Sequence, residues 1–264
     1  MANRRELMKK KATRATSTKK QDPEKILVID IGGSKIKILA SGETEARKVA
    51  SGKKLTPTRM IELVTGLAEG WSFDAVSVGY PGLVGPNGPR SEPGNLGPGW
   101  VGFDFASAFE RPVRCINDAA MQALGSYEGG RMLFLGLGTG LGSTFIAENV
   151  IIPLELGQVP FREDQTLGAL VSRAGLRRLG KTAWRSIVNE MVGAFTHAFL
   201  ADYVVLGGGN AKVVKELPPG ARRGHNLTAF RGGFRLWNID DMPTLSTKND
   251  PSVVRPAATE WRVI

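Results

Sequence analysis

Three glycine-rich turns, each directly after an apolar run typical of a buried strand, constrain the fold of this chain most. They are Asp30–Lys35, Gly136–Ser143 and Gly207–Gly209. Glycine lacks a Cβ, so the backbone N–H groups of such turns can approach the oxygens of a phosphate. Each turn alone has an ordinary alternative as a tight turn or a close packing contact. Three of them in one chain favour a phosphate-binding cleft.

The order of strand and helix patterns is the same in the two halves of the chain. Each half has a strand, a glycine turn and a second strand, followed by alternating helix and strand patterns. We therefore expect an α/β fold whose halves face each other and bring the turns to one cleft. The expected segments are a disordered basic tail (1–22), an N-terminal α/β lobe (23–118), a C-terminal α/β lobe (119–238) and an irregular C-terminal tail (239–264).

The formal net charge of +10 favours polyanionic partners: nucleotides, polyphosphate, nucleic acid or an anionic membrane. Much of the excess lies in the first 20 residues, which have little apolar content and are typical of a solubilising tail. No apolar run approaches the roughly 20 residues of a bilayer span, so we expect no membrane protein. Cys115 is the only cysteine, which excludes an internal disulfide and fits a reducing cytoplasm.

Two aspartates follow strand patterns. Asp30 precedes the first glycine turn, where its carboxylate could hold a metal ion that bridges phosphates, or could cap the turn. Asp118 follows Asn117 after another strand, where it could accept the proton of a substrate hydroxyl or could serve as a helix N-cap. Together with the glycine turns, the base is the favoured interpretation of Asp118.

Other polar residues carry less information. Glu155 and Gln158 follow a strand-like stretch, and Asn95 lies in a long glycine- and proline-rich loop. Carboxylates and amides in such places can hold the hydroxyls of a sugar, or can simply be polar loop residues. His197 and His225 are isolated from other metal-type ligands, and His197 is interpreted as a structural residue.

In combination, the motifs resemble the ROK sugar kinases of the actin-like ATPase superfamily, and most closely their polyphosphate glucokinase-like members. Asp30–Lys35 resembles the first phosphate motif and Asn117–Ala120 the catalytic motif. Gly136–Gly142 resembles the second phosphate motif and Leu206–Gly209 the adenosine motif. Order and spacing agree over residues 25–212. The resemblance implies two ribonuclease-H-like lobes around a central cleft.

The resemblance also implies a function, which is the transfer of a phosphoryl group from polyphosphate or ATP to a hexose hydroxyl, giving glucose 6-phosphate from glucose. Asp118 would be the general base and Asp30 would hold Mg²⁺. The implied substrate-binding residues are Asn95, Asn117, Glu155 and Gln158. The implied phosphate-binding residues are Gly32, Gly33, Ser34, Lys35, Gly138, Thr139 and Gly140. The implied nucleotide-binding residues are Gly207, Gly208 and Gly209.

The sequence departs from the ROK pattern in two places. Gln158 replaces the histidine of the usual Glu-x-Gly-His, which leaves another sugar or an amino sugar open as the acceptor. The cysteine-rich zinc motif is absent, so no zinc is expected. The choice between ATP and polyphosphate and the presence of a homodimer also stay open.

The alternative of another class is a non-catalytic, sugar-responsive regulator that binds a polyanion, because the family includes DNA-binding repressors. Those repressors carry a winged helix-turn-helix domain before the first phosphate motif. Only about two dozen polar residues precede Lys25 here, too few for such a domain. Nucleic acid is therefore not expected as a partner.

Overall fold

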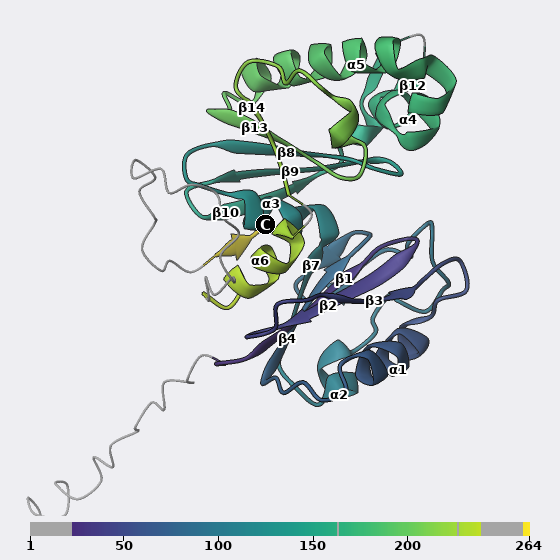
Figure 1. Cartoon of the computed structure of the whole chain (residues 1–264), viewed down its shortest axis with the longest axis vertical. Helices are drawn as coiled ribbons and strands as arrows, with labels where there is room; N and C mark the ends of the chain where they lie inside the picture. Colours follow the sequence, from purple (N-terminus) through teal and green to yellow (C-terminus); the bar gives the residue numbers. More distant parts are fainter. Residues whose placement is uncertain (1–22, 163, 226, 239–260) are drawn as a thin grey trace, which may run out of the picture.

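Two mixed sheets, with helices between them and on their outer faces, form the framework of the protein (Figure 1). The structure is a computed structural model that describes residues 23–162, 164–225, 227–238 and 261–264. The first sheet has the strand order β3 (Arg47–Ala50), β2 (Lys35–Ala40), β1 (Ile26–Ile31), β4 (Ala75–Tyr80) and β7 (Val113–Asn117). The second has the order β14 (Ala221–Arg223), β13 (Tyr203–Gly207), β8 (Met132–Leu137), β9 (Leu141–Ala147), β10 (Val150–Leu154) and β15 (Arg262–Val263).

The two sheets have the same internal arrangement. In the first, β1, β2 and β3 form an antiparallel meander, and β4 and β7 continue the sheet in parallel to β1. In the second, β8, β9 and β10 form the meander, and β13 and β14 are the parallel strands. The repeated pattern expected from the sequence is therefore confirmed. Two short ribbons, β5 (Val84–Gly85) with β6 (Gly88–Pro89) and β11 (Pro160–Arg162) with β12 (Gln165–Thr166), lie outside these sheets.

The helices separate and cover the sheets. They are α1 (Pro57–Leu67), α2 (Phe105–Phe109), α3 (Asp118–Ser126), α4 (Leu167–Val171), α5 (Arg173–Ala198) and α6 (Thr228–Arg235), with the 3₁₀ turns η1 (Leu156–Gln158) and η2 (Ala211–Val213). Figure 1 shows α3 and α6 between the two sheets, α1 and α2 outside the first, and α4 and α5 outside the second. Alternate residues of β1 accordingly pack in different cores. Leu27 and Ile29 contact the α1 side, whereas Ile26 and Val28 belong to the central core with Phe134 of β8.

The contact between α3 and α6 depends on glycine. A Cβ on Gly125 of α3 would lie 1.8 Å from the Thr228 carbonyl oxygen, and a Cβ on Gly232 of α6 would lie 1.8 Å from the Met121 carbonyl oxygen. The two helix backbones therefore touch. On its other side α6 rests on the first sheet, where the buried Ser77 hydroxyl donates to the Gly233 carbonyl at 2.7 Å. Residues late in the chain thus complete the core of the first sheet.

Several sequence expectations can be compared with these elements. The Thr56-Pro57 pair is typical of a helix start, and Thr56 caps α1. The long helix α5 is broken at Gly180 (φ 75°). Helix α6 was not predicted. Residues 1–22 and 239–260 lie outside the described residues. The last four residues do not match an irregular tail, because β15 pairs in parallel with β10. The lobe boundary at residue 118 stays a prediction.

Within the described ranges, no helix is both long enough and apolar enough to cross a membrane.

Candidate active site

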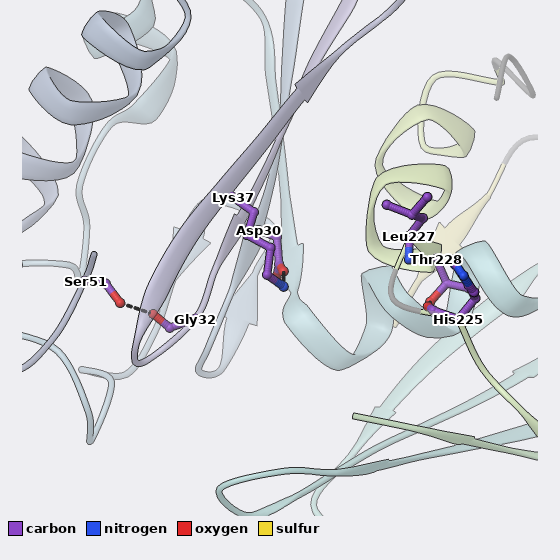
Figure 2. Close-up of polar contacts among 7 residues, drawn as sticks. All are labelled: Asp30, Gly32, Lys37, Ser51, His225, Leu227 and Thr228. Atoms are coloured by element: carbon purple, nitrogen blue, oxygen red, sulfur yellow. Dashed lines mark hydrogen bonds and ion pairs between the residues drawn. The ribbon is translucent and has the colours of Figure 1, made fainter. Parts of the chain in front are cut away.

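The first glycine turn joins β1 to β2 and is held by one hydrogen bond within the turn and two from Ser51. The Gly32 N–H donates to the Lys35 carbonyl at 3.0 Å, which closes the turn. The Ser51 hydroxyl donates to the Gly32 carbonyl at 2.5 Å, and the Ser51 N–H donates to Ser34 at 3.1 Å (Figure 2). The side chains of Ser34 and Lys35 remain exposed. The turn is thus fixed from behind while its outer side is free for a ligand.

Asp30 forms an ion pair that the sequence analysis missed. Its Oδ2 lies 2.9 Å from the Lys37 ammonium, and Figure 2 shows the two side chains pointing toward one another. Antiparallel pairing places the two residues opposite each other across β1 and β2. Asp30 is only 7% exposed, so the ammonium compensates a largely buried charge. The signal was present in the sequence, because the two residues are equidistant from the centre of the hairpin turn.

Asp118 begins α3 but is not its N-cap. The Asn117 side-chain oxygen takes that role and accepts from the N–H groups of Ala119 at 2.9 Å and Ala120 at 3.2 Å. The Asn117 amide also donates to the Gly82 carbonyl at 3.1 Å. These contacts leave Asn117 little capacity for a ligand. The helix-cap alternative considered for Asp118 therefore belongs to its neighbour.

The two aspartates lie on either side of β4 in the first sheet. Strand pairing aligns Asp30 with Gly79 of β4, and Gly79 with Ile116 of β7. Ile116, two residues before Asp118, therefore lies about two strand spacings from Asp30, roughly 10 Å. A Cβ on Gly79 would lie 2.3 Å from the Met121 Cε and 3.6 Å from the Asp118 Cα. Glycine here lets the buried Met121 side chain and the start of α3 pack closely against β4.

The surroundings of Asp118 make it a suitable base at neutral pH. Burial and, to a lesser extent, the negative charges of Asp30 and Glu155 together raise the pKa of Asp118 to about 7, against the hydrogen bond from the Ala119 N–H, which lowers it. The side chain is partly buried rather than enclosed. A group that titrates near the working pH can both take up and release a proton.

The raised pKa predicts a pH dependence for any reaction that uses Asp118 as a base. The deprotonated carboxylate is required, so kcat/KM should rise as pH increases through about 7, and fall about tenfold per pH unit well below it. An aspartate with an ordinary pKa would lose activity only near pH 4. Initial rates in overlapping buffers from about pH 5 to 9 measure this. A profile that stays flat down to pH 5 would contradict the assignment.

The second glycine turn, between β8 and β9, is fixed on two sides. The Gly138 carbonyl accepts from the Arg173 N–H of α5 at 2.9 Å and from the Asn210 side chain at 3.3 Å. The outer residues Thr139 and Gly140 are exposed, and neither Gly138 nor Gly140 has an atom within 4 Å of an added Cβ. Sequence analysis missed the role of Asn210.

Close packing brings this second turn toward Asp118. A Cβ on Gly142 of β9 would lie 2.8 Å from the Ala119 Cβ of α3. Because Ala119 directly follows Asp118, the start of β9 lies against the helix turn that carries the candidate base. The glycine turn and the base are thus brought together by a contact that only glycine permits.

The third glycine turn packs against the second. Gly208 has φ +77°, and its added Cβ would lie 2.5 Å from the Leu137 carbonyl oxygen. Its glycine is therefore required by the protein itself. Gly209 is exposed, and nothing lies within 4 Å of its added Cβ, so it is the member of the triplet that is free to contact a ligand. Only the 3₁₀ turn η2 follows it directly.

Asn95 is brought to the first glycine turn by a well-anchored loop. The Glu92 carboxylate accepts from the Trp100 N–H at 3.2 Å, and the Tyr80 hydroxyl donates to the Ser91 carbonyl at 2.9 Å. An added Cβ on Gly33 would lie 2.3 Å from the Asn95 Nδ2. The Asn95 Oδ1 is buried and has no hydrogen-bond partner among the described residues. An unpaired buried acceptor is costly, so this oxygen is a candidate for pairing with a ligand or an ordered water.

Glu155 and Gln158 lie at the ends of η1 and are exposed. The turn is tied to β9, because the Ser143 hydroxyl accepts from the Leu156 N–H at 3.1 Å and donates to the Leu154 carbonyl at 2.8 Å. The charge of Glu155 contributes to the raised pKa of Asp118, so the structure places it on the same side as the base. No hydrogen bond of its side chain is present within the described part of the chain.

Other features lie away from these residues. A cavity of about 610 Å³ is lined by Trp71, Asp74 and Arg111 among others. It lies at the amino ends of β1, β4 and β7, opposite to Asp30 and Asn117. His225 lies beside α6, apart from the Asp30–Lys37 pair (Figure 2). Among the described residues, no three His, Cys, Asp or Glu side chains form a group that could hold a metal ion.

The fold and the glycine turns define the class of structure: two related α/β halves of the actin-like ATPase type, as found in ROK sugar kinases. An inorganic polyphosphate/ATP-glucomannokinase from Arthrobacter sp. strain KM matches with a TM-score of 0.67 and 23% identity, over 79% of this chain and 96% of that protein. A ROK family glucokinase from Streptomyces griseus, solved with glucose and AMPPNP, matches with a TM-score of 0.60 and 16% identity, over 79% and 97%. The fold implied by the motifs is therefore confirmed.

The same fold also occurs in a regulator. A ROK family transcriptional regulator, a homologue of the E. coli MLC protein, matches with a TM-score of 0.57 and 14% identity, over 79% of this chain and 76% of that protein. No protein-family model matches the sequence. No curated protein matches it either.

Proposed function

We propose that the protein is a sugar kinase that transfers a phosphoryl group from polyphosphate or ATP to a hexose hydroxyl, with glucose 6-phosphate as the product from glucose. One observation carries the proposal. Asp118, whose pKa is raised to about 7, lies beside the contact of α3 with the second glycine turn and across β4 from Asp30. A base between phosphate-binding turns is the arrangement that phosphoryl transfer to a hydroxyl requires.

In this proposal each group has a limited task. Asp118 takes the proton from the attacking hydroxyl. The backbone N–H groups of the two glycine turns hold the donor phosphates, and Lys35 adds a positive charge at the first turn. The rate then depends mainly on positioning and on charge stabilisation, because phosphoryl transfer needs little covalent help from the protein.

Mg²⁺ fits this site through Asp30. One Asp30 oxygen is paired with Lys37, and the other has no partner among the described residues. This arrangement suits Mg²⁺, which commonly binds proteins through one carboxylate and several waters. When bound, the ion would neutralise charge on the donor phosphates. Lys37 supplies a second, permanent positive charge at the same carboxylate. We place the protein in the cytoplasm in this proposal, because it has a single cysteine and its proposed product is a phosphorylated sugar.

The unpaired Asn95 oxygen predicts a sugar contact. Asn95→Ala should raise KM for the sugar about tenfold, the value of one hydrogen bond, while kcat changes less. The melting temperature should not fall, since the change removes a buried unsatisfied oxygen. Steady-state kinetics and a melting curve measure both. Asn189→Ala, which truncates an exposed asparagine of α5, is the matched control. An unchanged sugar KM would remove Asn95 from the site.

Gln158 bears on which sugar is the acceptor. Gln158 stands where the ROK motif has histidine, and its side chain is exposed near Glu155. An amide can still donate to and accept from sugar hydroxyls. Kinases of other sugars and amino sugars therefore remain within the proposal, and glucose is the first candidate.

Polyphosphate is favoured over ATP as the donor by the structure around Gly209. Where a long helix could cover an adenine ring, only the three-residue turn η2 follows the glycine triplet. Bulky substitution at Gly209, as in Gly209→Val, should therefore impair turnover with ATP more than turnover with polyphosphate. Gly208 is unsuitable for this test, because any side chain there meets the Leu137 backbone.

The deciding experiment crosses ATP and polyphosphate with glucose, mannose and N-acetylated amino sugars in a coupled assay with Mg²⁺. Formation of a sugar phosphate by the wild-type protein, lost in Asp118→Asn, supports the proposal. Sugar binding without turnover from any donor would instead favour the sugar-responsive regulator, whose fold is the same.

A further inference from the structure

One structured region of the protein carries positively charged side chains and no negatively charged ones. Between Gln165 and Asn189, which includes α4 and most of α5, there are five cations and no acidic residue. Exposed helix faces ordinarily mix both signs, because opposite charges three or four positions apart stabilise a helix. The cations are Arg173, Arg177, Arg178, Lys181 and Arg185.

Among the described residues, two of these cations have side-chain partners and three do not. The Arg178 side chain donates to the Gln165 side-chain oxygen at 2.6 Å, and Arg185 donates to the Val213 carbonyl at 2.7 Å. Arg173, Arg177 and Lys181 are exposed, and their side chains make no hydrogen bond or ion pair with any residue in the described ranges. These three are available to an anion.

The available cations start at the second glycine turn. The Arg173 N–H donates to the Gly138 carbonyl, and Arg177 follows one helical turn later on the same face, roughly 6 Å along the axis. On the other side of Gly138, Asn210 leads into η2, which carries the exposed Lys212. The bond from Arg185 to Val213 holds η2 beside α5. The cations therefore lead outward from the turn that would hold the donor.

Their position is unfavourable for the helix alone. Arg173 and Arg177 lie at the start of α5, whose first turn contains no acid, and the positive end of the helix dipole disfavours cations there. Local rules are most often broken where a site requires it. A bound polyanion would remove the repulsion.

We propose that Arg173, Arg177, Lys181 and Lys212 form a donor track that holds the part of a linear polyphosphate extending beyond its reacting end. This rests on the proposed function, and it deepens the choice of donor. ATP and tripolyphosphate carry only three phosphates in a row, so we expect them to reach no further than the second glycine turn while their terminal phosphate is at Asp118. Only a long chain would use it, and each phosphate of that chain brings a negative charge.

The test compares Arg173→Gln/Arg177→Gln with the control Arg59→Gln/Arg111→Gln, which removes the same charge from exposed sites on the first half. Both are made in the full chain. KM is measured for long-chain polyphosphate, tripolyphosphate and ATP, and binding of long-chain polyphosphate is measured by calorimetry without sugar. We expect KM and Kd for the long chain to rise between about threefold and thirtyfold, the value of two exposed ion pairs, with KM for the short donors and kcat unchanged. The difference should shrink at high salt.

Each outcome decides something. Equal losses with long and short donors, or losses equal to those of the control, would overturn the track. If wild-type protein turns over no polyphosphate, the proposed donor fails, and selective loss of long-chain binding in the variant would still support a polyanion track. If single-stranded DNA competes for the site more strongly than polyphosphate, and the variant loses that binding, the track belongs to nucleic acid and the proposal is wrong.

Discussion

Asp118→Asn should abolish most turnover while the protein still folds and binds sugar. Asparagine has nearly the same shape but cannot take a proton, so kcat should fall on the order of hundredfold or more. Because the change removes a charge whose ionisation burial disfavours, the melting temperature should stay equal or rise. Coupled kinetics, sugar calorimetry and a melting curve measure the three quantities.

The matched control is Asp104→Asn. Asp104 caps α2, with its carboxylate accepting from the Ser107 N–H at 3.0 Å and from the Ser107 hydroxyl at 2.7 Å. Asparagine caps helices about as well as aspartate, so this change should leave kcat and stability unchanged. Near-normal turnover in Asp118→Asn would remove it as the base. A collapse of sugar binding together with turnover would show a structural role instead.

Gly232→Ala should strongly destabilise the protein, because it adds a methyl group where the backbones of α3 and α6 touch. Its Cβ would lie 1.8 Å from the Met121 carbonyl oxygen, so α3 and α6 must separate. Overpacking of this kind costs about 1–3 kcal/mol and occasionally more, and a backbone clash belongs to the upper part of that range. Urea denaturation measures the loss of unfolding free energy. The dependence of this free energy on urea concentration should stay unchanged, which shows that the unfolded state is not altered.

Gly66→Ala provides the opposite control. Gly66 lies within α1, and nothing is within 4 Å of its added Cβ. Alanine is the better helix former, so the protein should gain about 0.5–1 kcal/mol. Equal urea midpoints for Gly232→Ala and the parent protein would mean that α3 and α6 do not cross as closely as described.

The sequence alone predicted the parts of the fold that depend on local pattern. The hairpin of β1 and β2 follows from alternating apolar residues around a glycine turn, and α1 from its Thr56-Pro57 start. Helix α6 was missed because Gly232 and Gly233 lower helix propensity, although tertiary contact with α3 requires the first of them. Propensity is a weak signal where packing decides.

In the candidate site, too, the sequence predicted the residues that belong to local motifs and missed the contacts that depend on folding. The motifs identified Asp30 and Asp118, but their environment depends on residues brought together by folding. The ion pair of Asp30 with Lys37 needs the strand register, and the capping role of Asn117 needs the helix geometry. The unpaired oxygen of Asn95 depends on a loop whose path is set by Glu92, which no local pattern indicates.

The position of α6 has a consequence for how the protein is made. The ribosome releases β1 first, yet one face of that strand is covered by a helix about two hundred residues further on. During synthesis the apolar face of β1 that carries Val28 therefore stays exposed until α6 has been made. Exposed sheet surfaces of nascent chains are prone to aggregation. The first half cannot mature as an independent unit while translation is incomplete. Premature termination before Thr228 should thus yield chains that depend on chaperones, rather than a stable fragment.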